Sequence, residues 1–122
     1  MQAEEPVKTT IVLCAARTVP GIENEMEARG MRVRWAPSIT AATALLDSAS
    51  NGTVVITELA LRDGNWRDLV ERLRCTGKPF RIALVSPTRT SELWWDALEC
   101  GVEDIFLAPL SVSRICEYLN VR

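Results

Sequence analysis

The sequence contains no histidine among its 122 residues. The usual general base of enzymes is therefore missing, and so are Ser–His and Cys–His nucleophile pairs and the commonest nitrogen ligand of zinc. The four cysteines show no CxxC spacing, which disfavours a zinc knuckle and a dithiol redox pair. We predict a protein that is not an enzyme and has no metal or cofactor, with buried, reduced thiols at Cys14, Cys75, Cys100 and Cys116.

Long apolar runs and an excess of positive charge are also missing. The longest apolar stretches have about five to seven residues, far fewer than the roughly 20 needed to cross a bilayer. Residues 1–6 are acidic, where a signal peptide would be basic and then apolar. Lys and Arg number 14 against 16 Asp and Glu, so no global positive field attracts nucleic acid or an anionic membrane. We predict a cytoplasmic protein that binds neither nucleic acid nor membranes.

The chain has the length and the composition of one globular domain, with 48% hydrophobic and 25% charged residues. We predict a single domain over residues 1–122, with its core at about 9–119. Short apolar runs alternate with helical patterns along the chain. Strands are predicted at 10–14, 31–36, 53–57, 80–85 and 105–107, and helices at 19–29, 39–48, from 66 to Gly77, at 91–100 and at 112–119. Alternating apolar and basic residues at 31–36 indicate a strand near a sheet edge.

Five strands alternating with five helices imply right-handed crossovers and a parallel sheet between two helix layers. The predicted fold is therefore a doubly wound α/β fold. In such a sheet the functional crevice lies beyond the carboxyl ends of the strands, where the strand order reverses. The residues expected there are Cys14-Ala15-Ala16 after the first strand, the loop 58–64 after the third, Ser86 after the fourth and Ala108-Pro109 after the fifth.

Together with residues 97–109, these segments resemble the receiver domain of two-component response regulators, over about residues 9–119. The resemblance implies the flavodoxin-like (βα)5 fold, a role in phosphorelay signal transduction, and a cis peptide at Ala108-Pro109. Family receivers carry an acidic pair after the first strand, a phosphorylated Asp ending the third, a Ser or Thr after the fourth, and a Lys before a Pro after the fifth. At these positions the sequence has Ala15 and Ala16, Glu58, Ser86 and Ala108, so only Ser86 matches.

The departures from the family pattern remove the chemistry of Asp phosphorylation. Mg²⁺ prefers several oxygen ligands, including carboxylates, and Ala15 and Ala16 provide none. Ala108 offers no ammonium to a phosphate oxygen, and Glu58 is one methylene longer than Asp, which moves its carboxylate off the in-line position. We therefore predict no phosphorylation by small donors or by a histidine kinase. The chain is expected to be a degenerate receiver that acts as a phosphorylation-independent protein interaction module.

Glu58 allows three interpretations. It imitates a phosphorylated Asp, in which case the Ser86 hydroxyl must bond to it; or it is a partly solvated carboxylate at a strand end, paired with Arg17 or Arg62. In a competing hypothesis, Glu58, Asp63 and Ser86 surround a metal in a true phosphoacceptor or a small metal-dependent enzyme. The sequence is compatible both with a complete protein and with the receiver portion of a regulator whose output domain follows residue 122.

Trp94 and Trp95 are adjacent on one predicted helix, so their side chains point about 100° apart and both cannot be buried in one seam. At least one indole is expected on the surface, where aromatic side chains are enriched among binding hot spots. By resemblance, receivers meet partners or form homodimers through their fourth helix, fifth strand and fifth helix. The candidate interface comprises Trp94, Trp95, Ile105, Ile115 and Tyr118, whereas Trp35 and Trp66 are expected in the core or at the sheet edge.

Overall fold

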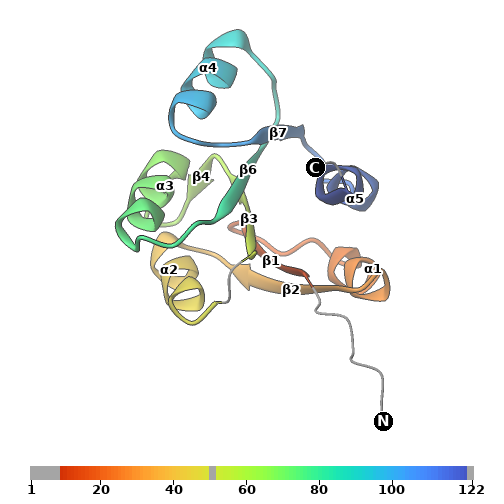
Figure 1. The fold of residues 1–122 in the computed structure, drawn as a ribbon. Helices are drawn as coiled ribbons and strands as arrows, with labels where there is room; N and C mark the ends of the chain where they lie inside the picture. The colour runs from red at the N-terminus through yellow and green to blue at the C-terminus, as the bar shows by residue number, and fades with distance from the viewer. Residues whose placement is uncertain (1–8, 50–51, 121–122) are drawn as a thin grey trace.

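Five runs of branched, apolar residues form one parallel sheet in the computed structural model, which describes residues 9–49 and 52–120. The strands are β1 (Thr9–Cys14), β2 (Met31–Ala36), β3 (Val54–Glu58), β6 (Arg81–Ser86) and β7 (Asp104–Leu107). Their spatial order is β2-β1-β3-β6-β7, with every neighbouring pair parallel (Figure 1). This order confirms the predicted flavodoxin-like fold and the edge position of β2. Residues 1–6 and residue 122, which entered the sequence predictions, lie outside the described residues.

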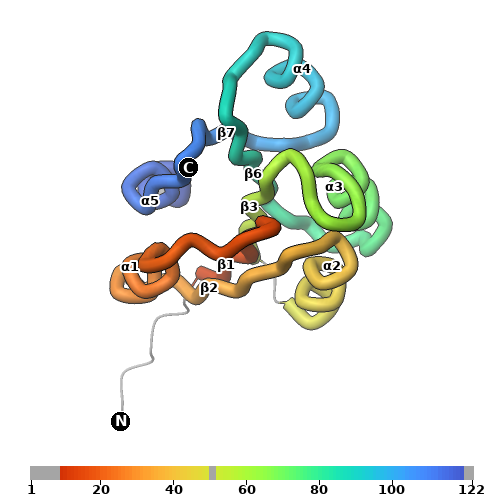
Figure 2. Tube along the Cα trace, turned by 180° about the vertical axis from the view of Figure 1, so that it is seen from behind, coloured from red at the N-terminus to blue at the C-terminus, as the bar shows by residue number. Residues whose placement is uncertain are grey.

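Helices cover the sheet on both faces, as Figures 1 and 2 show. Helices α1 (Ile22–Ala28) and α5 (Val112–Asn120) pack on one face, and α2 (Ile39–Asp47), α3 (Trp66–Cys75) and α4 (Ser91–Glu99) lie toward the other. Each face has its own cluster of buried side chains, and the sheet separates the two clusters. Within the described ranges, no helix has the length and apolar character needed to cross a membrane.

Two local differences from the sequence prediction have physical causes. The first helix was expected from residue 19 but begins at Ile22, because Gly21 has a φ of 85° and cannot belong to a right-handed helix. The loop after β3 contains a small antiparallel hairpin, β4 (Ala60–Leu61) and β5 (Gly64–Asn65), where only a turn was expected. Asn65 then caps α3 by accepting hydrogen bonds from the N–H groups of Arg67 and Asp68.

The prediction of four buried thiols is wrong for Cys75 and only partly right for two others. All four cysteines are free: Cys14 is buried, Cys100 and Cys116 are half-buried, and Cys75 is exposed. Cys75 lies off the buried stripe of α3, which ends with Leu73.

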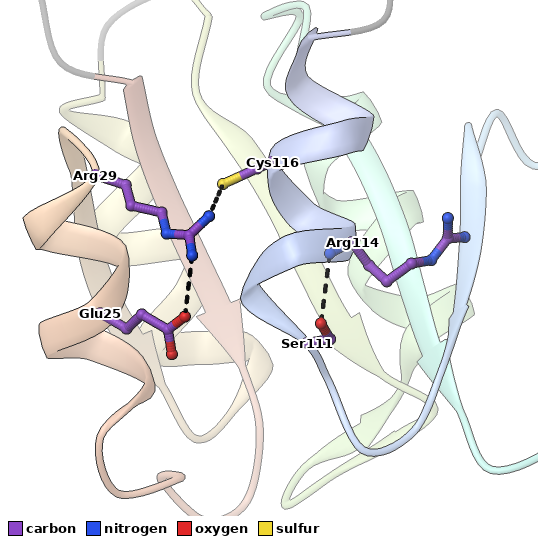
Figure 3. A network of polar contacts seen from close by, with 5 residues as sticks. All are labelled: Glu25, Arg29, Ser111, Arg114 and Cys116. Carbon is purple, nitrogen blue, oxygen red and sulfur yellow. Dashed lines mark hydrogen bonds and ion pairs between the residues drawn. The ribbon is translucent and has the colours of Figure 1, made fainter.

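The half-buried thiol on α5 takes part in the contact between α1 and α5 (Figure 3). There the Arg29 guanidinium donates to Cys116 Sγ at 3.7 Å and pairs with Glu25 at 3.4 Å. At the start of α5, the Ser111 hydroxyl accepts a hydrogen bond from the Arg114 N–H at 3.5 Å. Of these contacts, the one between Arg29 and Cys116 joins the first and last helices of the described chain, and the other two are local to one helix.

Candidate functional site

A cavity of about 140 Å³ lies beyond the carboxyl ends of the strands, beside the point where the order of the sheet reverses. We call it the switch-point cavity. Its lining comes from the ends of β1, β2, β3 and β6, from the loop before α1 and from the segment after β7, and consists of Leu13, Cys14, Ala15, Val19, Trp35, Ile56, Glu58, Val85, Ala108, Pro109 and Leu110. Glu58 is the only residue in this lining with an acidic or basic side chain.

The fold brings together the positions that the sequence singled out. Ala15, Glu58 and Ala108 line the same cavity, and the Ala16 N–H donates to Glu58 Oε1 at 3.3 Å. The Ala108 N–H donates to the Ser86 carbonyl at 2.9 Å. The peptide between Ala108 and Pro109 is cis, as the resemblance implied. The backbone segments that were predicted to surround the crevice therefore do surround it, while the side chains that line it are mostly apolar.

In the part of the chain that the structure describes, the Ser86 hydroxyl forms its hydrogen bonds with Thr88 and none with Glu58. Its side chain is fully buried, and its hydroxyl donates to the Thr88 carbonyl and accepts from the Thr88 N–H at 3.1 Å. The contact that the phosphoryl-mimic interpretation requires is therefore missing, and Ser86 acts as a structural hydroxyl of the loop after β6. The pairing expected for Glu58 is also wrong: within residues 9–49 and 52–120, neither Arg17 nor Arg62 forms an ion pair with it.

The residues of the crevice do not fit a divalent cation. The competing hypothesis needs Asp63 beside Glu58, but Asp63 lies in the β4–β5 turn and binds the start of α2. Its carboxylate accepts from the Ile39 N–H at 2.7 Å, from the Thr40 N–H at 3.1 Å and from the Thr40 hydroxyl at 3.0 Å. Among the described residues, no group of three or more acidic, cysteine or histidine side chains could hold a metal. Glu58 alone supplies too few of the oxygen ligands that Mg²⁺ prefers.

Asp63 instead predicts a pH dependence of stability. The hydrogen bond from the Ile39 N–H, with those from Thr40, lowers the pKa of Asp63 below its ordinary value of 3.8. Because the folded-state pKa is the lower one, this stabilisation is fully present above pH 3.8 and is lost as the pH falls through the folded-state pKa. In urea unfolding, the native chain should have a higher midpoint than Asp63→Asn. This difference in midpoint should be largest near neutral pH and should shrink in acid. A difference that stays constant with pH would contradict this role.

Cys14 is the one thiol in the crevice, and burial makes it unreactive. Burial raises the pKa of Cys14 to about 12, and the hydrogen bond with Thr57 on the neighbouring strand offsets only part of this rise. The thiolate is the nucleophilic form of cysteine, so a thiol with this pKa stays protonated and inert at neutral pH.

The two adjacent tryptophans of α4 separate as predicted. The side chain of Trp95 is 64% exposed, whereas Trp94 is half-buried beneath the Arg89 guanidinium, which lies 5.6 Å from its ring centre. A hollow of about 310 Å³ lies between them and β7, lined by Arg89, Thr90, Ser91, Trp94, Trp95 and Ile105. Trp66 is buried and Trp35 is half-buried on the edge strand β2, in agreement with the sequence prediction.

Two members of the candidate interface are corrected by the structure. Ile105 and Ile115 are both 0% exposed, so neither presents a surface to a partner. Ile105 packs in the core on the α4 side of the sheet, because helices cover both faces of β7. Ile115 lies on the inner stripe of α5, three residues after the buried Val112.

The remaining part of this surface includes one residue that the sequence did not reveal. Leu107, at the end of β7, is 52% exposed and joins Trp95 and Leu98 among the exposed large apolar side chains. Tyr118 is half-buried and donates a hydrogen bond to Glu103, while its ring meets Phe106 edge-on at 5.5 Å. Burial, aided by Glu103, raises the pKa of Tyr118, so its hydroxyl stays protonated. The accessible apolar residues of the α4 and β7 surface are thus Trp95, Leu98 and Leu107.

Comparisons with known proteins place the fold. No family model matches the sequence, and a search of curated protein sequences gives no match. Solved structures do match: a two-component response regulator from Clostridium difficile has a TM-score of 0.80 at 18% identity, covering 92% of this chain and 93% of its own. A response regulator receiver protein from Pseudomonas putida has a TM-score of 0.79 at 20% identity, covering 97% and 100%.

A third structure shows such a fold in a chemically modified state. It is a response regulator protein from Burkholderia pseudomallei with a phosphorylated aspartic acid, a calcium ion and citrate. Its TM-score is 0.76 at 22% identity, covering 94% of this chain and 68% of its own. The chain described here has the receiver fold of these response regulators.

Proposed function

We propose that this chain is a receiver-type domain of two-component signalling that works by binding another protein, without phosphorylation of its crevice and without catalysis. One observation carries the proposal: the receiver fold is complete, but the crevice has alanine at positions 15, 16 and 108 and one carboxylate, Glu58. A phosphoryl group in this crevice would have no metal ligands and no lysine to offset its charge. Cytoplasmic location remains a prediction.

The proposed contact surface is the exposed apolar part of α4 and β7. Trp95, Leu98 and Leu107 are three of the four exposed large apolar side chains in the described ranges. Large aromatic side chains at the centre of an interface carry a disproportionate share of binding energy, so Trp95 is the proposed anchor. Its occupant is another signalling protein or a second copy of this chain, and the second copy can be tested with the protein alone.

Sedimentation velocity over a range of concentrations tests self-association. We expect a concentration-dependent dimer, and Trp95→Ala should raise its dissociation constant at least about tenfold through the loss of a hot-spot side chain. The matched control is Val19→Ala, which shortens an exposed apolar side chain outside α4 and β7. Acetyl phosphate with Mg²⁺ should leave the dissociation constant unchanged. A monomer at every concentration would reject the second copy as occupant, and a shift on adding acetyl phosphate would reject phosphorylation independence.

A further inference from the structure

We propose that the switch-point cavity is a binding site for a small organic ammonium ion, in which an apolar body about the size of a benzene ring carries one protonated amine. The apolar body would fill the cavity, and the ammonium group would pair with the carboxylate of Glu58. This inference goes beyond the proposed function, because it gives the crevice a ligand of its own in place of a phosphoryl group.

The size and the lining of the cavity determine the apolar part of the ligand. The cavity holds about 140 Å³ and is open to solvent beside Val19, Ala108 and Pro109, which are exposed. Its volume is close to the roughly 150 Å³ of an enclosed apolar protein cavity that binds benzene. Leu13 and Ile56 are buried on neighbouring central strands, and Val85 continues the same wall on β6. Ala108 and Leu110 add apolar surface from the segment after β7. A compact hydrocarbon group therefore matches both the volume and the surface.

Trp35 supplies an aromatic wall whose polar atom is already satisfied. Its indole N–H donates to Glu23 at 2.9 Å, so a ligand in the cavity need not satisfy that group. What Trp35 offers to the cavity is ring surface. Indole rings pack well against other aromatic groups and attract cations to their faces, which favours an aromatic amine over a purely aliphatic acid or alcohol.

The charge of the cavity determines the polar part of the ligand. Glu58 is half-buried at the carboxyl end of β3, and the structure gives its side chain one hydrogen bond, the 3.3 Å contact from the Ala16 N–H to Oε1. Within the described ranges no arginine or lysine pairs with it, and Ser86 is held by Thr88. An anionic ligand would meet this carboxylate without any compensating cation. A protonated amine would form a charge-assisted hydrogen bond in a partly desolvated place.

Three probes of nearly equal shape separate the contributions of size and charge: benzylamine, which is cationic at neutral pH, neutral benzyl alcohol, and anionic benzoate. Each is titrated into the ¹⁵N-labelled full chain and followed by amide chemical shifts. We expect benzylamine to bind with a dissociation constant of about 1 mM or tighter, which is reasonable for a ligand of this size. Benzyl alcohol should bind more weakly and benzoate most weakly. The perturbed amides should cluster at residues 13–16 and 56–58 and at Ala108 and Leu110, on either side of Pro109, which has no amide proton.

Two kinds of variant test the assignment to this cavity. Glu58→Gln keeps the shape and removes the charge, so it should weaken benzylamine at least about tenfold and leave benzyl alcohol nearly unchanged. Glu99→Gln is the matched control, since it removes one exposed carboxylate from α4, and it should change neither. Val85→Phe and Ala108→Leu fill the cavity from two different elements and should both abolish binding. Two variants are used so that the test still gives a result if one of them fails to fold.

The proposal is overturned if no probe binds in the millimolar range, if benzoate binds as well as benzylamine, or if Glu58→Gln has no more effect than Glu99→Gln. It is also overturned if the perturbed amides lie elsewhere, for example on α4. Self-association through the α4 and β7 surface is measured by sedimentation, whereas ligand binding in the cavity is measured by amide chemical shifts. Failure of the ligand site can therefore be distinguished from failure of the proposed function.

Discussion

A variant carrying Ala15→Asp, Ala16→Asp, Glu58→Asp and Ala108→Lys is expected to take up one phosphoryl group from acetyl phosphate in the presence of Mg²⁺, whereas the native chain takes up none. The backbone positions are already in place, because Ala15, Glu58 and Ala108 line one cavity and Ala16 is hydrogen-bonded to Glu58. The substitutions supply what the native side chains lack, namely carboxylate ligands for the metal and an ammonium for the phosphoryl oxygens. Intact-mass measurement would detect the added group.

The size of this effect follows from the number of groups restored. Loss of a single preorganised charge-stabilising donor typically slows a reaction by about 10²–10³-fold, so the rate should rise by at least that factor when several are restored. The matched control keeps Glu58 and carries only the other three substitutions. This control should remain unmodified, since the longer side chain displaces the attacking oxygen. Phosphorylation of the native chain would show that its crevice does not lack the groups that the reaction needs. Phosphorylation of the control would show that the longer side chain of Glu58 does not prevent the reaction.

The second large effect is expected at Gly64 in the β4–β5 hairpin. Its φ is 156°, and a Cβ atom placed there would lie 2.6 Å from Cδ1 of Ile39 and 2.7 Å from Oδ2 of Asp68. Ile39 is buried in the core, and Asp68 is held by the N–H of Asn65 at 3.0 Å, so neither neighbour can move freely. Gly64→Ala should therefore displace the start of α2, the cap of α3, or both.

Gly77→Ala provides the control for this prediction, because Gly77 also has a positive φ, of 75°, but has no atom within 4 Å of the added Cβ. Both substitutions cost backbone strain, but only Gly64→Ala adds a clash in a packed region. We expect Gly64→Ala to lower the free energy of unfolding by about 1–3 kcal/mol more than Gly77→Ala, as overpacking does in other cores. Urea unfolding monitored by tryptophan fluorescence would measure both. Equal losses would show that the neighbours of Gly64 yield without cost.

The sequence predicted the sheet well because its strands are covered on both faces. The runs at residues 11–14 and 54–56 are continuously apolar and rich in branched side chains, and this pattern predicts buried strands once helical segments separate the runs. The β4–β5 hairpin was missed for the opposite reason. Each of its strands has two residues, and they lie within a segment whose Asp63 and Gly64 are equally typical of a simple turn.

The candidate site was predictable in position but not in its contacts. The predicted fold class, the ends of the predicted strands and the resemblance to receivers placed Ala15, Glu58 and Ala108 together, and the structure brings them into one cavity. The partner of Ser86 could not be read from the sequence, because the hydroxyl turns to Thr88 two residues along its own loop. Likewise, the resemblance indicated the helices and the strand of the interface, but not whether Ile105 and Ile115 are buried or exposed. Their burial depends on how α4 and α5 pack on the sheet.

The cluster of side chains beneath α1 and α5 has a consequence for synthesis of the chain on the ribosome. It joins Ile22 and Met26, near the start of the described chain, to Val112 and Ile115, near its end. A nascent chain that has not yet produced α5 therefore leaves the part of this face that α5 covers, with Phe106 on it, open to water. Such intermediates associate readily with one another or with chaperones. The domain should thus reach its native state only after α5 has left the exit tunnel, whatever helical structure its earlier segments have formed by then.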